Sequence, residues 1–461
     1  MTAPPGRPPV DRCLVGPSTE AERQARLVLS RLVEPGHRGV HGAVASLGAV
    51  EVQRALSAGR RLPGLTRRLT DGIALRAAGL DLAADQRHLE ACGGRILCPG
   101  DEEWPTCLDW DPHLATAQGV RLEAPPLVLF VRGPQRLNDL VRRSVAVVGA
   151  RAATRYGESV ATELAAGLVV RGWSVVSGGA YGIDAAAHRG ALAAGGRPAS
   201  MAAVPSAAAL SAAALSAAEP SFVGLSGDRS FVEQSGDRSS SAGSSTTAST
   251  VAVLACGVDV SYPRGNDRLL RQIAETGLLV SELPPQAAPT RIRFLVRNRL
   301  IAALSAGTVV VQAAARSGSL STLHRAGALG RHRMVVPGPV QDASSAGCHQ
   351  ALREDPMGVV LVTRLGEVLE CVGQVGEDAI APLRGPEHPR DALDVTVLRV
   401  LEAVPVRRGA GEASIAQVAG VSALVVQQVL PSLHLAGLVE RHPTGGWRLT
   451  ALGASSPGQA R

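Results

Sequence analysis

The sequence contains no lysine, so all 47 of its basic residues are arginines. A Walker-type P-loop requires a lysine, and this absence excludes that route to ATP hydrolysis. No stretch reaches the roughly 20 consecutive apolar residues that a membrane span requires. The opening residues MTAPPGRPPVDRC also lack the apolar middle of a signal peptide, and we expect a cytoplasmic protein with no membrane partner.

Cysteine is present, but in no arrangement typical of a metal site or a disulfide framework. The seven cysteines are an odd number scattered through a long chain, which favours free thiols. Cys92, Cys98 and Cys107 lack the paired short spacing of a zinc site. The dinucleotide fingerprint G-x-G-x-x-G is missing too, since Ser177 stands where its first glycine would be. We therefore expect no metal and no cofactor.

The positive charge that the sequence does carry is large, with a formal net charge of +7. Arginine can donate two parallel hydrogen bonds to one phosphate and can stack on bases, which suits a nucleic-acid partner. A genome rich in G and C also replaces lysine by arginine, so the composition alone leaves both explanations open.

Short continuous apolar runs alternate with helical patterns across the middle of the chain. Runs of this length that end in turn residues are typical of strands buried on both faces of a sheet. They predict an α/β fold with an extended, Rossmann-like, doubly wound sheet. The runs lie at 144–150, 173–179, 250–257, 277–282, 307–313 and 332–338, with a further strand candidate at 126–133.

Changes in periodicity and composition predict further domains on both sides of this sheet. Apolar residues three and four apart indicate an N-terminal helical domain of the SAM or helix-hairpin-helix type, in which LPGL at 62–65 is either a phosphate-binding hairpin or a plain turn. Three helices followed by two short strands indicate a C-terminal winged helix. The expected boundaries are a disordered N-terminus at 1–20, the helical domain at 21–85, a connecting segment at 86–140, the Rossmann-like domain at 141–355 with a disordered insertion at 198–249, a linker at 356–390, the winged helix at 391–452 and a tail at 453–461.

Three strand-to-helix turns carry residues suited to phosphate binding. In a doubly wound sheet the ligand lies at the carboxyl ends of the strands, where free amides and helix dipoles attract anions. Glycine leaves the amides of such a turn bare, and we expect a ligand with more than one phosphate. The turns hold Gly149 and Arg151 in the first, Ser177, Gly178, Gly179 and Gly182 in the second, and Arg316, Ser317 and Gly318 in the third.

A cluster of arginines precedes the third turn. In RIRFLVRNRLIAALSAG, at 291–307, the arginines alternate with apolar residues, and we expect an extended segment that approaches the ligand. An ordinary basic surface would show the same pattern. Phe294 offers either a face for base stacking or a core side chain. The polar members are Arg291, Arg293, Arg297, Asn298 and Arg299.

Candidates for acid–base chemistry are few. Asp184 and His188 lie four residues apart on one predicted helical face, as a catalytic or metal-binding pair would. An aspartate in the first turn of a helix is also ordinary capping chemistry. No third ligand or nucleophile accompanies the pair, so we interpret the site as one that binds.

Seven ordered motifs resemble the core of the DNA-processing protein A family, also called DprA or Smf. They include VAVVGARAATRYG, VVSGGAYGIDAAAHRGAL, RFLVRNRLIAALS and SGSLSTLHRAG, and they cover about 144–350 apart from the insertion. The resemblance implies a binding protein that holds and protects incoming single-stranded DNA during natural transformation. It also implies loading of the RecA recombinase and a homodimer formed through the Rossmann-like domain. Gln312 departs from the glutamate usual in the family.

The predicted single-stranded DNA site combines the resemblance with the turns, and no catalytic residue is expected. A Rossmann-fold nucleotide hydrolase of the phosphoribohydrolase kind is the alternative, although SGSLST lacks the PGGxGT motif and the nearby glutamate of those enzymes. A duplex-reading regulator is a third possibility, but segment 422–437 contains no arginine and we expect that domain to contact protein. The site residues are Arg151, Ser177, Gly178, Gly179, Arg297, Asn298, Arg299, Ser317 and Gly318.

Overall fold

The chain divides into two compact units, Met1–Ile380 and Ala381–Arg461, which we describe separately. The predictions for the N-terminus, the insertion and the C-terminal tail fall almost wholly outside the described residues. The computed structural model describes residues 18–111, 122–195, 249–374, 377–378, 390 and 393–454.

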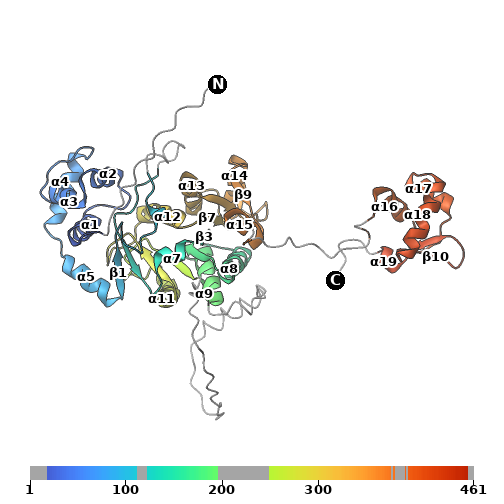
Figure 1. Ribbon diagram of the computed structural model, residues 1–461, viewed down its shortest axis with the longest axis horizontal. Helices are drawn as coiled ribbons and strands as arrows, with labels where there is room; N and C mark the ends of the chain where they lie inside the picture. Colours follow the sequence, from blue (N-terminus) through green and yellow to red (C-terminus); the bar gives the residue numbers. More distant parts are fainter. Residues whose placement is uncertain are drawn as a thin grey trace, which may run out of the picture. The chain divides into compact units, whose positions relative to one another are not determined.

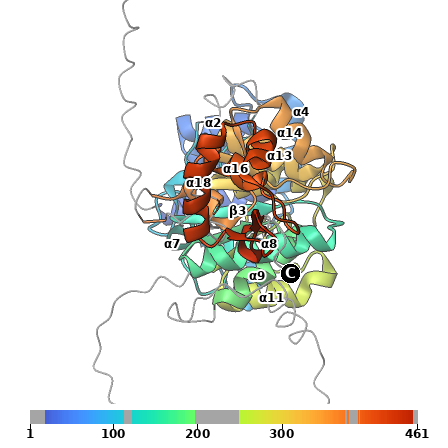
Figure 2. The same ribbon diagram turned by 90° about the vertical axis from the view of Figure 1, so that its right-hand side faces the viewer.

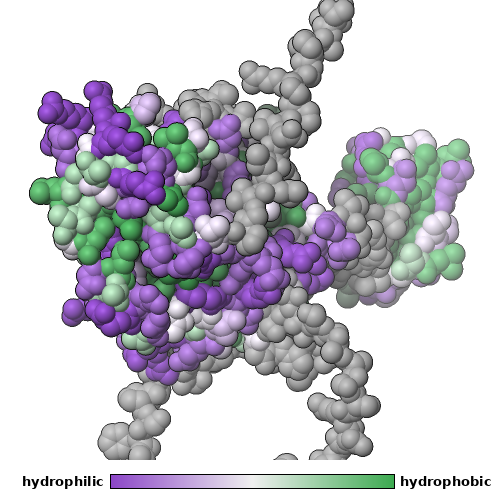
Figure 3. All heavy atoms as spheres, turned by 60° about the vertical axis from the view of Figure 1, so that its left-hand side comes forward, coloured by the Kyte–Doolittle hydropathy of each residue, from purple (hydrophilic) through white to green (hydrophobic). Residues whose placement is uncertain are grey.

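Helices open the first unit, as the periodicity predicts. The side chains of Thr19, Thr66 and Asp81 each accept a hydrogen bond from a backbone N–H in the first turn of a helix. This N–H has no partner inside the helix, so the cap stabilises the helix start. Some apolar side chains of these helices are exposed, and Leu75 has 80% of its surface accessible. Figure 3 shows apolar and polar side chains intermixed on one face of the molecule. The helices are α1 (Glu20–Leu32), α2 (Arg38–Leu47), α3 (Ala49–Ser57), α4 (Arg67–Ala77) and α5 (Leu82–Ala91).

A large mixed sheet of nine strands forms the body of this unit, in the order β1-β2-β6-β5-β4-β3-β7-β8-β9. The strands from β6 to β9 in this order pair in parallel, whereas β2 pairs antiparallel with both β1 and β6. Each apolar run that predicts a strand contains one. The strands are β1 (Gly94–Leu97), β2 (Leu129–Arg132), β3 (Ser144–Val148), β4 (Ser174–Ser177), β5 (Thr250–Val253), β6 (Leu278–Ser281), β7 (Gly307–Val310), β8 (His332–Val335) and β9 (Val359–Leu361).

Helices cover both faces of the sheet because its strands are apolar on both sides. Along β3, Val145 and Val147 enter one core while Ala146 and Val148 enter the other. Figures 1 and 2 show α13 and α14 on one side of β3 and α8 and α9 on the other. One layer holds α8 (Arg155–Val170), α9 (Ile183–Gly195), α11 (Asp267–Thr276) and α15 (Leu365–Val372), and the other holds α7 (Leu137–Val141), α12 (Arg291–Ala303), α13 (Gly318–Ala328) and α14 (Ala346–Glu354).

The structure at the two edges of the sheet differs from the predicted domain boundaries. The connecting segment 86–140 contributes β1, and the predicted linker 356–390 contains β9 and α15, whose Val368 and Leu369 are buried. Both edge strands are very short and only partly buried. β1 (GRIL) lacks the continuous apolar run that identifies an inner strand, whereas β9 begins such a run, VVLV at 359–362, which the prediction left in the linker.

The second unit is a small helical bundle with one antiparallel hairpin, built around its own apolar core. No single helix in the described part of the chain is long and apolar enough to cross a membrane, and only α17 and α18 together, bent by 105°, reach that length and composition. The elements of the second unit are α16 (Val395–Glu402), α17 (Glu412–Ala419), α18 (Ala423–Leu435), β10 (Val439–Arg441), β11 (Trp447–Leu449) and α19 (Ala451–Ala454).

The order of the parallel strands reverses at β3, since β4, β5 and β6 follow on one side and β7, β8 and β9 on the other. Ligands of open α/β sheets bind at the carboxyl ends of the strands beside such a reversal. The loops after β3 and β4 meet there at Gly182, which has a φ of +71°. A Cβ at this position would lie 2.3 Å from the carbonyl oxygen of Ala150.

We expect Gly182→Ala to lower the free energy of unfolding by about 1–3 kcal/mol, because alanine would hold a strained backbone while its Cβ strikes the neighbouring loop. Gly172→Ala is the matched control, since Gly172 has a φ of +76° but a Cβ there would meet no atom within 4 Å. Equilibrium unfolding in urea measures both variants. Equal losses would contradict the close approach of the two loops.

Candidate functional site

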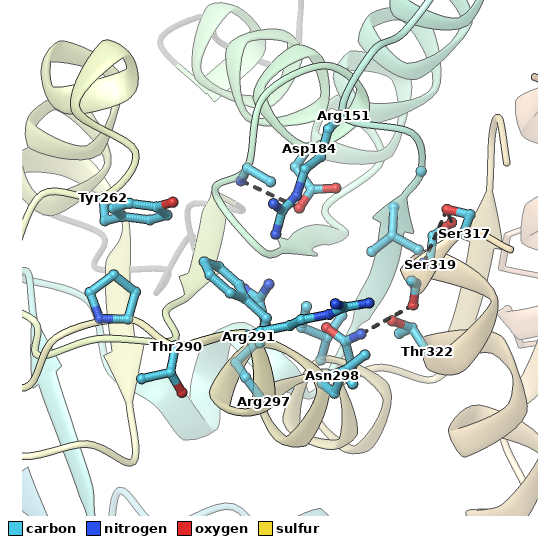
Figure 4. Close-up of a pocket in the computed structure, with 18 of the residues that line it drawn as sticks. Arg151, Asp184, Tyr262, Thr290, Arg291, Arg297, Asn298, Ser317, Ser319 and Thr322 are labelled. Atoms are coloured by element: carbon cyan, nitrogen blue, oxygen red, sulfur yellow. Dashed lines mark hydrogen bonds between the residues drawn. The ribbon is translucent and has the colours of Figure 1, made fainter. Parts of the chain in front are cut away.

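A cavity of about 590 Å³ opens at the point where the strand order reverses (Figure 4). The loops after β3, β4 and β7 and the first turns of α12 form its walls. Of the nine predicted site residues, five line this cavity: Arg151, Arg297, Asn298, Ser317 and Gly318.

The loop after β4 already contains a carboxylate of the chain itself. Oδ2 of Asp184 accepts hydrogen bonds from the backbone nitrogens of Gly178, at 3.1 Å, and Ala180, at 3.4 Å. Burial raises the pKa of this carboxyl, and the charge of Arg297 acts in the opposite direction. The prediction that these amides are free for a phosphate is therefore wrong. Asp184, in the first turn of α9, thus holds the loop that precedes this helix.

The remaining residues of that loop lie behind the cavity. Ser177 is fully buried and its Oγ donates to the carbonyl oxygen of Val147 at 2.7 Å. Gly178 lines a smaller adjoining cavity, and Gly179 has a φ of +67° that only glycine adopts easily. These residues shape the loop and hold Asp184, while the cavity wall itself is made by their neighbours.

Arg297 joins the ends of two strands beneath the cavity. Its Nη1 donates to the carbonyl oxygens of Gly178, at 2.8 Å, and Val253. Only 7% of the residue is exposed, and burial lowers the pKa of its guanidinium to about 10. The group therefore stays charged at neutral pH, and its buried Nε has no hydrogen-bond partner within the described chain.

Three further arginines of the cavity wall are exposed: Arg151, Arg291 and Arg316. They come from the loop after β3, the first turn of α12 and the loop after β7. In the part of the chain that the structure describes, none of them forms an ion pair. Their guanidinium groups are free to bind a negatively charged ligand.

The loop that carries Arg151 is held at both ends by Gln312. The backbone oxygen of Gln312 accepts from the nitrogen of Ala150 at 2.7 Å, and its Oε1 accepts from the nitrogen of Thr154 at 3.0 Å. Its Nε2 donates to Oγ1 of Thr154 at 3.0 Å and to Oγ of Ser344 at 2.6 Å. The neutral side chain that departs from the family pattern is thus fully hydrogen-bonded and adds no charge beside Arg151.

The N-terminus of α13 forms the wall opposite the glycine-rich loop. Oγ of Ser317 accepts from the nitrogen of Ser319 at 3.3 Å and caps the helix. Nδ2 of the buried Asn298 donates to the carbonyl oxygen of Gly318 at 3.2 Å and to Oγ of Ser321 at 3.3 Å. Ser317, Gly318 and Ser319 line the cavity, so the start of α13 and its partial positive charge lie at the cavity wall.

Two aromatic rings complete the wall. Phe294 is half-buried and lines the cavity rather than the core, with its ring centroid 5.7 Å from that of Tyr262. The guanidinium of Arg151 lies 4.7 Å from the same Phe294 ring. Tyr262, in the segment after β5, was not among the predicted site residues. Within the described residues, no three His, Cys, Asp or Glu side chains are placed to hold a metal.

The arginine cluster at 291–307 is helical, so the prediction of an extended segment is wrong. Thr290 caps α12, and the apolar residues Leu300 and Ile301 follow Arg297 at helical spacing. Positions two apart in a helix point to nearly opposite sides, and Arg299 consequently faces the interior. Its side chain is fully buried, and its Nε donates a hydrogen bond to the carbonyl oxygen of Ala124. Its Nη2 lies 2.7 Å from Oε2 of Glu282 in an ion pair. Arg299 is therefore not part of the cavity.

An arginine-lined cavity at the switch point of a doubly wound sheet defines a class of α/β proteins that bind phosphate-bearing ligands. The sequence model of the family described as DNA recombination-mediator protein A matches residues 95–215 and 237–372, more than half of the chain. The chain belongs to this family, also named DprA or Smf, which confirms the resemblance seen in the motifs.

Individual relatives support the assignment across most of the sequence. The chain is 39% identical over 434 residues to a Mycobacterium tuberculosis protein that carries the DprA name, which covers 92% of this chain and 94% of that protein. It is 31% identical over 304 residues to protein Smf of Escherichia coli, covering 65% and 66% respectively. The X-ray structure of DNA processing protein A from Streptococcus pneumoniae matches with a TM-score of 0.53 and 25% identity, over 78% of this chain and 99% of that one.

We expect Arg299→Leu to lower the free energy of unfolding by about 3–5 kcal/mol, because it leaves Glu282 buried without its partner. The double variant Arg299→Leu, Glu282→Leu should recover most of this loss, since it removes both charges. Arg291→Leu, at an exposed position, should change stability by no more than about 0.5 kcal/mol. Urea unfolding of the three variants tests this, and a harmless Arg299→Leu would contradict the buried ion pair.

Proposed function

We propose that the cavity binds single-stranded DNA and that the chain is a recombination mediator rather than an enzyme. One observation carries the proposal: three exposed arginines, which form no ion pair with the residues that the structure describes, come from three separate elements and surround one cavity that also presents a half-buried phenylalanine. Guanidinium groups bind the phosphates of a strand, and aromatic faces stack on its bases. This combination fits an unpaired polynucleotide.

The dimensions of the cavity favour a single strand over a duplex. At about 590 Å³ it has the volume of a small-molecule site, in which an unpaired base with its sugar and phosphate fits. The bases of a duplex are stacked inside the helix and cannot reach the ring of Phe294. Binding is expected to depend little on sequence, because stacking and phosphate contacts do not distinguish the bases.

Base release from a nucleotide, the alternative function, has little support in the cavity. Asp184 is the one carboxylate among the described residues that line it, and this group is already bonded to two amides and buried. A hydrolase needs a carboxylate or another base within reach of the reacting atom. Holding the strand without altering it is the simpler use of these residues.

The wider role follows from the family resemblance in the motifs. We propose that the strand held here is passed to the RecA recombinase during natural transformation in the cytoplasm, and that the chain acts as a homodimer joined through its Rossmann-like domain. The order of elements in the second unit, three helices and then a hairpin, supports its assignment as a winged helix.

Fluorescence anisotropy with a labelled oligothymidylate tests the binding proposal. The logarithm of the affinity should fall with the logarithm of the salt concentration, by about 0.7 for each phosphate neutralised on a single strand. Arg151→Ala and Arg316→Ala should each weaken binding about tenfold, which corresponds to about 1.4 kcal/mol. Arg268→Ala, an exposed position on α11, is the matched control and should bind like the wild type.

Three results would overturn this function. The first is tighter binding to a duplex of the same length, and the second is an affinity that does not change with salt. The third is release of free base from a nucleoside monophosphate at a rate that Asp184→Asn abolishes.

A further inference from the structure

A groove of about 500 Å³ lies at the β1 edge of the sheet and shares no lining residue with the cavity of the proposed function. The helices α1 and α5 form its walls, and β1 with its neighbour β2 forms its floor (Figure 1). All four elements belong to the first unit. A ligand in this groove would therefore contact none of the residues that line the cavity.

The floor of the groove is apolar. Phe130 of β2 and Leu89 of α5 are buried in a small core beneath it. Leu27 of α1 and Ile96 of β1 pack against that core but remain partly exposed, and Leu82 adds a further partly exposed side chain at the start of α5. Apolar surface that remains in contact with water favours a partner that buries it.

The two arginines of the groove are neutralised by carboxylates that lie outside its lining. Nη1 of Arg23 lies 2.6 Å from Oδ1 of Asp101, and Nη2 of Arg95 lies 2.5 Å from Oε1 of Glu103. Neither guanidinium is therefore free to attract an anionic ligand into the groove.

The carboxylates of the groove are compensated only in part. Asp85 is paired with Arg31, near the end of α1. Glu20 on α1 and Glu90 on α5 are exposed, and neither forms an ion pair within the described chain. Each accepts a hydrogen bond from the neutral amide of a glutamine one turn away on its own helix, at 2.8 and 2.9 Å. The rim of the groove thus carries two uncompensated negative charges, in a chain whose net charge is +7.

The backbone near the end of β1 is already occupied, which disfavours the addition of a further strand. An edge strand can pair with an extended peptide through its free backbone groups. Here the carbonyl oxygen of Ile96 accepts from Nη2 of Arg23 at 3.1 Å. The nitrogen of Cys98, just beyond the strand, donates to Oδ2 of Asp101 at 2.8 Å. The groove therefore favours an occupant that is held by its side chains, as an amphipathic helix is.

We propose that this surface, which we call the α1–α5 groove (Leu27, Leu82, Ile96, Glu20 and Glu90), binds an amphipathic helix of a partner protein with an apolar face flanked by basic side chains. The apolar face covers the floor, and the basic side chains meet the two free carboxylates of the rim. These carboxylates repel phosphate, so a nucleic acid does not fit here. The proposal does not depend on what the cavity binds.

Fluorescence anisotropy with a labelled model peptide tests the proposal on the full-length chain. The peptide consists of leucine and lysine, with its leucines at helical spacing (LKKLLKL, repeated once). We expect it to bind the wild type. The same residues in strand-like alternation (LKLKLKL, repeated once) should bind at least about tenfold more weakly, because they do not form an apolar helical face. The affinity should fall as salt is added, since salt screens the charges of the rim.

Charge variants at exposed positions test the role of the rim. Glu20→Gln, Glu90→Gln removes both free charges and should weaken binding of the helical peptide about fivefold, as two partly exposed ion pairs supply. The matched control is Glu163→Gln, Glu275→Gln, which removes two exposed carboxylates from α8 and α11. It should bind like the wild type.

A second pair of variants tests the location without changing a carboxylate. Ala83→Arg places a long, positively charged side chain at an exposed position of the lining and should abolish binding. Ala91→Arg adds the same side chain at an exposed position of α5 outside the lining and should leave binding unchanged. Arginine is a good helix former, so both variants should keep the fold.

Binding that Ala83→Arg loses and Ala91→Arg keeps supports the α1–α5 groove. No binding by the wild type overturns it, as do equal binding by Ala83→Arg and a preference for the alternating peptide or for an acidic one (LEELLEL, repeated once). Self-association of the wild type in sedimentation that Ala83→Arg abolishes would assign the groove to a second copy of the chain and overturn the proposal as well. None of these outcomes bears on oligothymidylate binding, so the proposed function is tested separately.

Discussion

The carboxylate of Asp184 and the guanidinium of Arg297 together determine how the binding edge of the sheet is built. The carboxylate satisfies two amides of the loop after β4, and the guanidinium satisfies carbonyl oxygens at the ends of β4 and β5. A buried charge is tolerated only when hydrogen bonds and an opposite charge compensate for its lost hydration. The amides bonded to Asp184 and the Nη1 of Arg297 are therefore already engaged inside the protein. The phosphate of the proposed ligand would instead be bound by the exposed arginines of the cavity wall.

The helix α12 connects that edge with the rest of the first unit. Arg297 and Asn298 face the cavity, Arg299 faces the interior, and the guanidinium of Arg293 binds Glu34, which follows α1, at 2.7 Å. One helix thus positions part of the ligand site while it joins the N-terminal helices to the sheet.

The inner strands were predictable from the sequence because burial on both faces requires continuous apolar runs such as VAVV in β3. The edge strand β1 (GRIL) was not, since a half-exposed strand has no such requirement, whereas the run VVLV that begins at β9 was present in the sequence and was missed. Arg151, Arg297 and Asn298, which were predicted as site residues, all line the cavity where the strand order reverses. The inward turn of Arg299 and the use of the loop amides by Asp184 depend on contacts through space, which residue spacing does not record.

The arginine-only composition gives the cavity a chemical property of its own. Its positively charged side chains are all guanidinium groups, and the described lining contains neither lysine nor histidine. Arginine remains protonated throughout the physiological range and is not a substrate for the acetylation that neutralises lysine. Binding of the proposed strand would therefore respond to competing anions and to ionic strength, whereas neither a change of pH within the physiological range nor an acetyltransferase would remove the positive charge of the cavity.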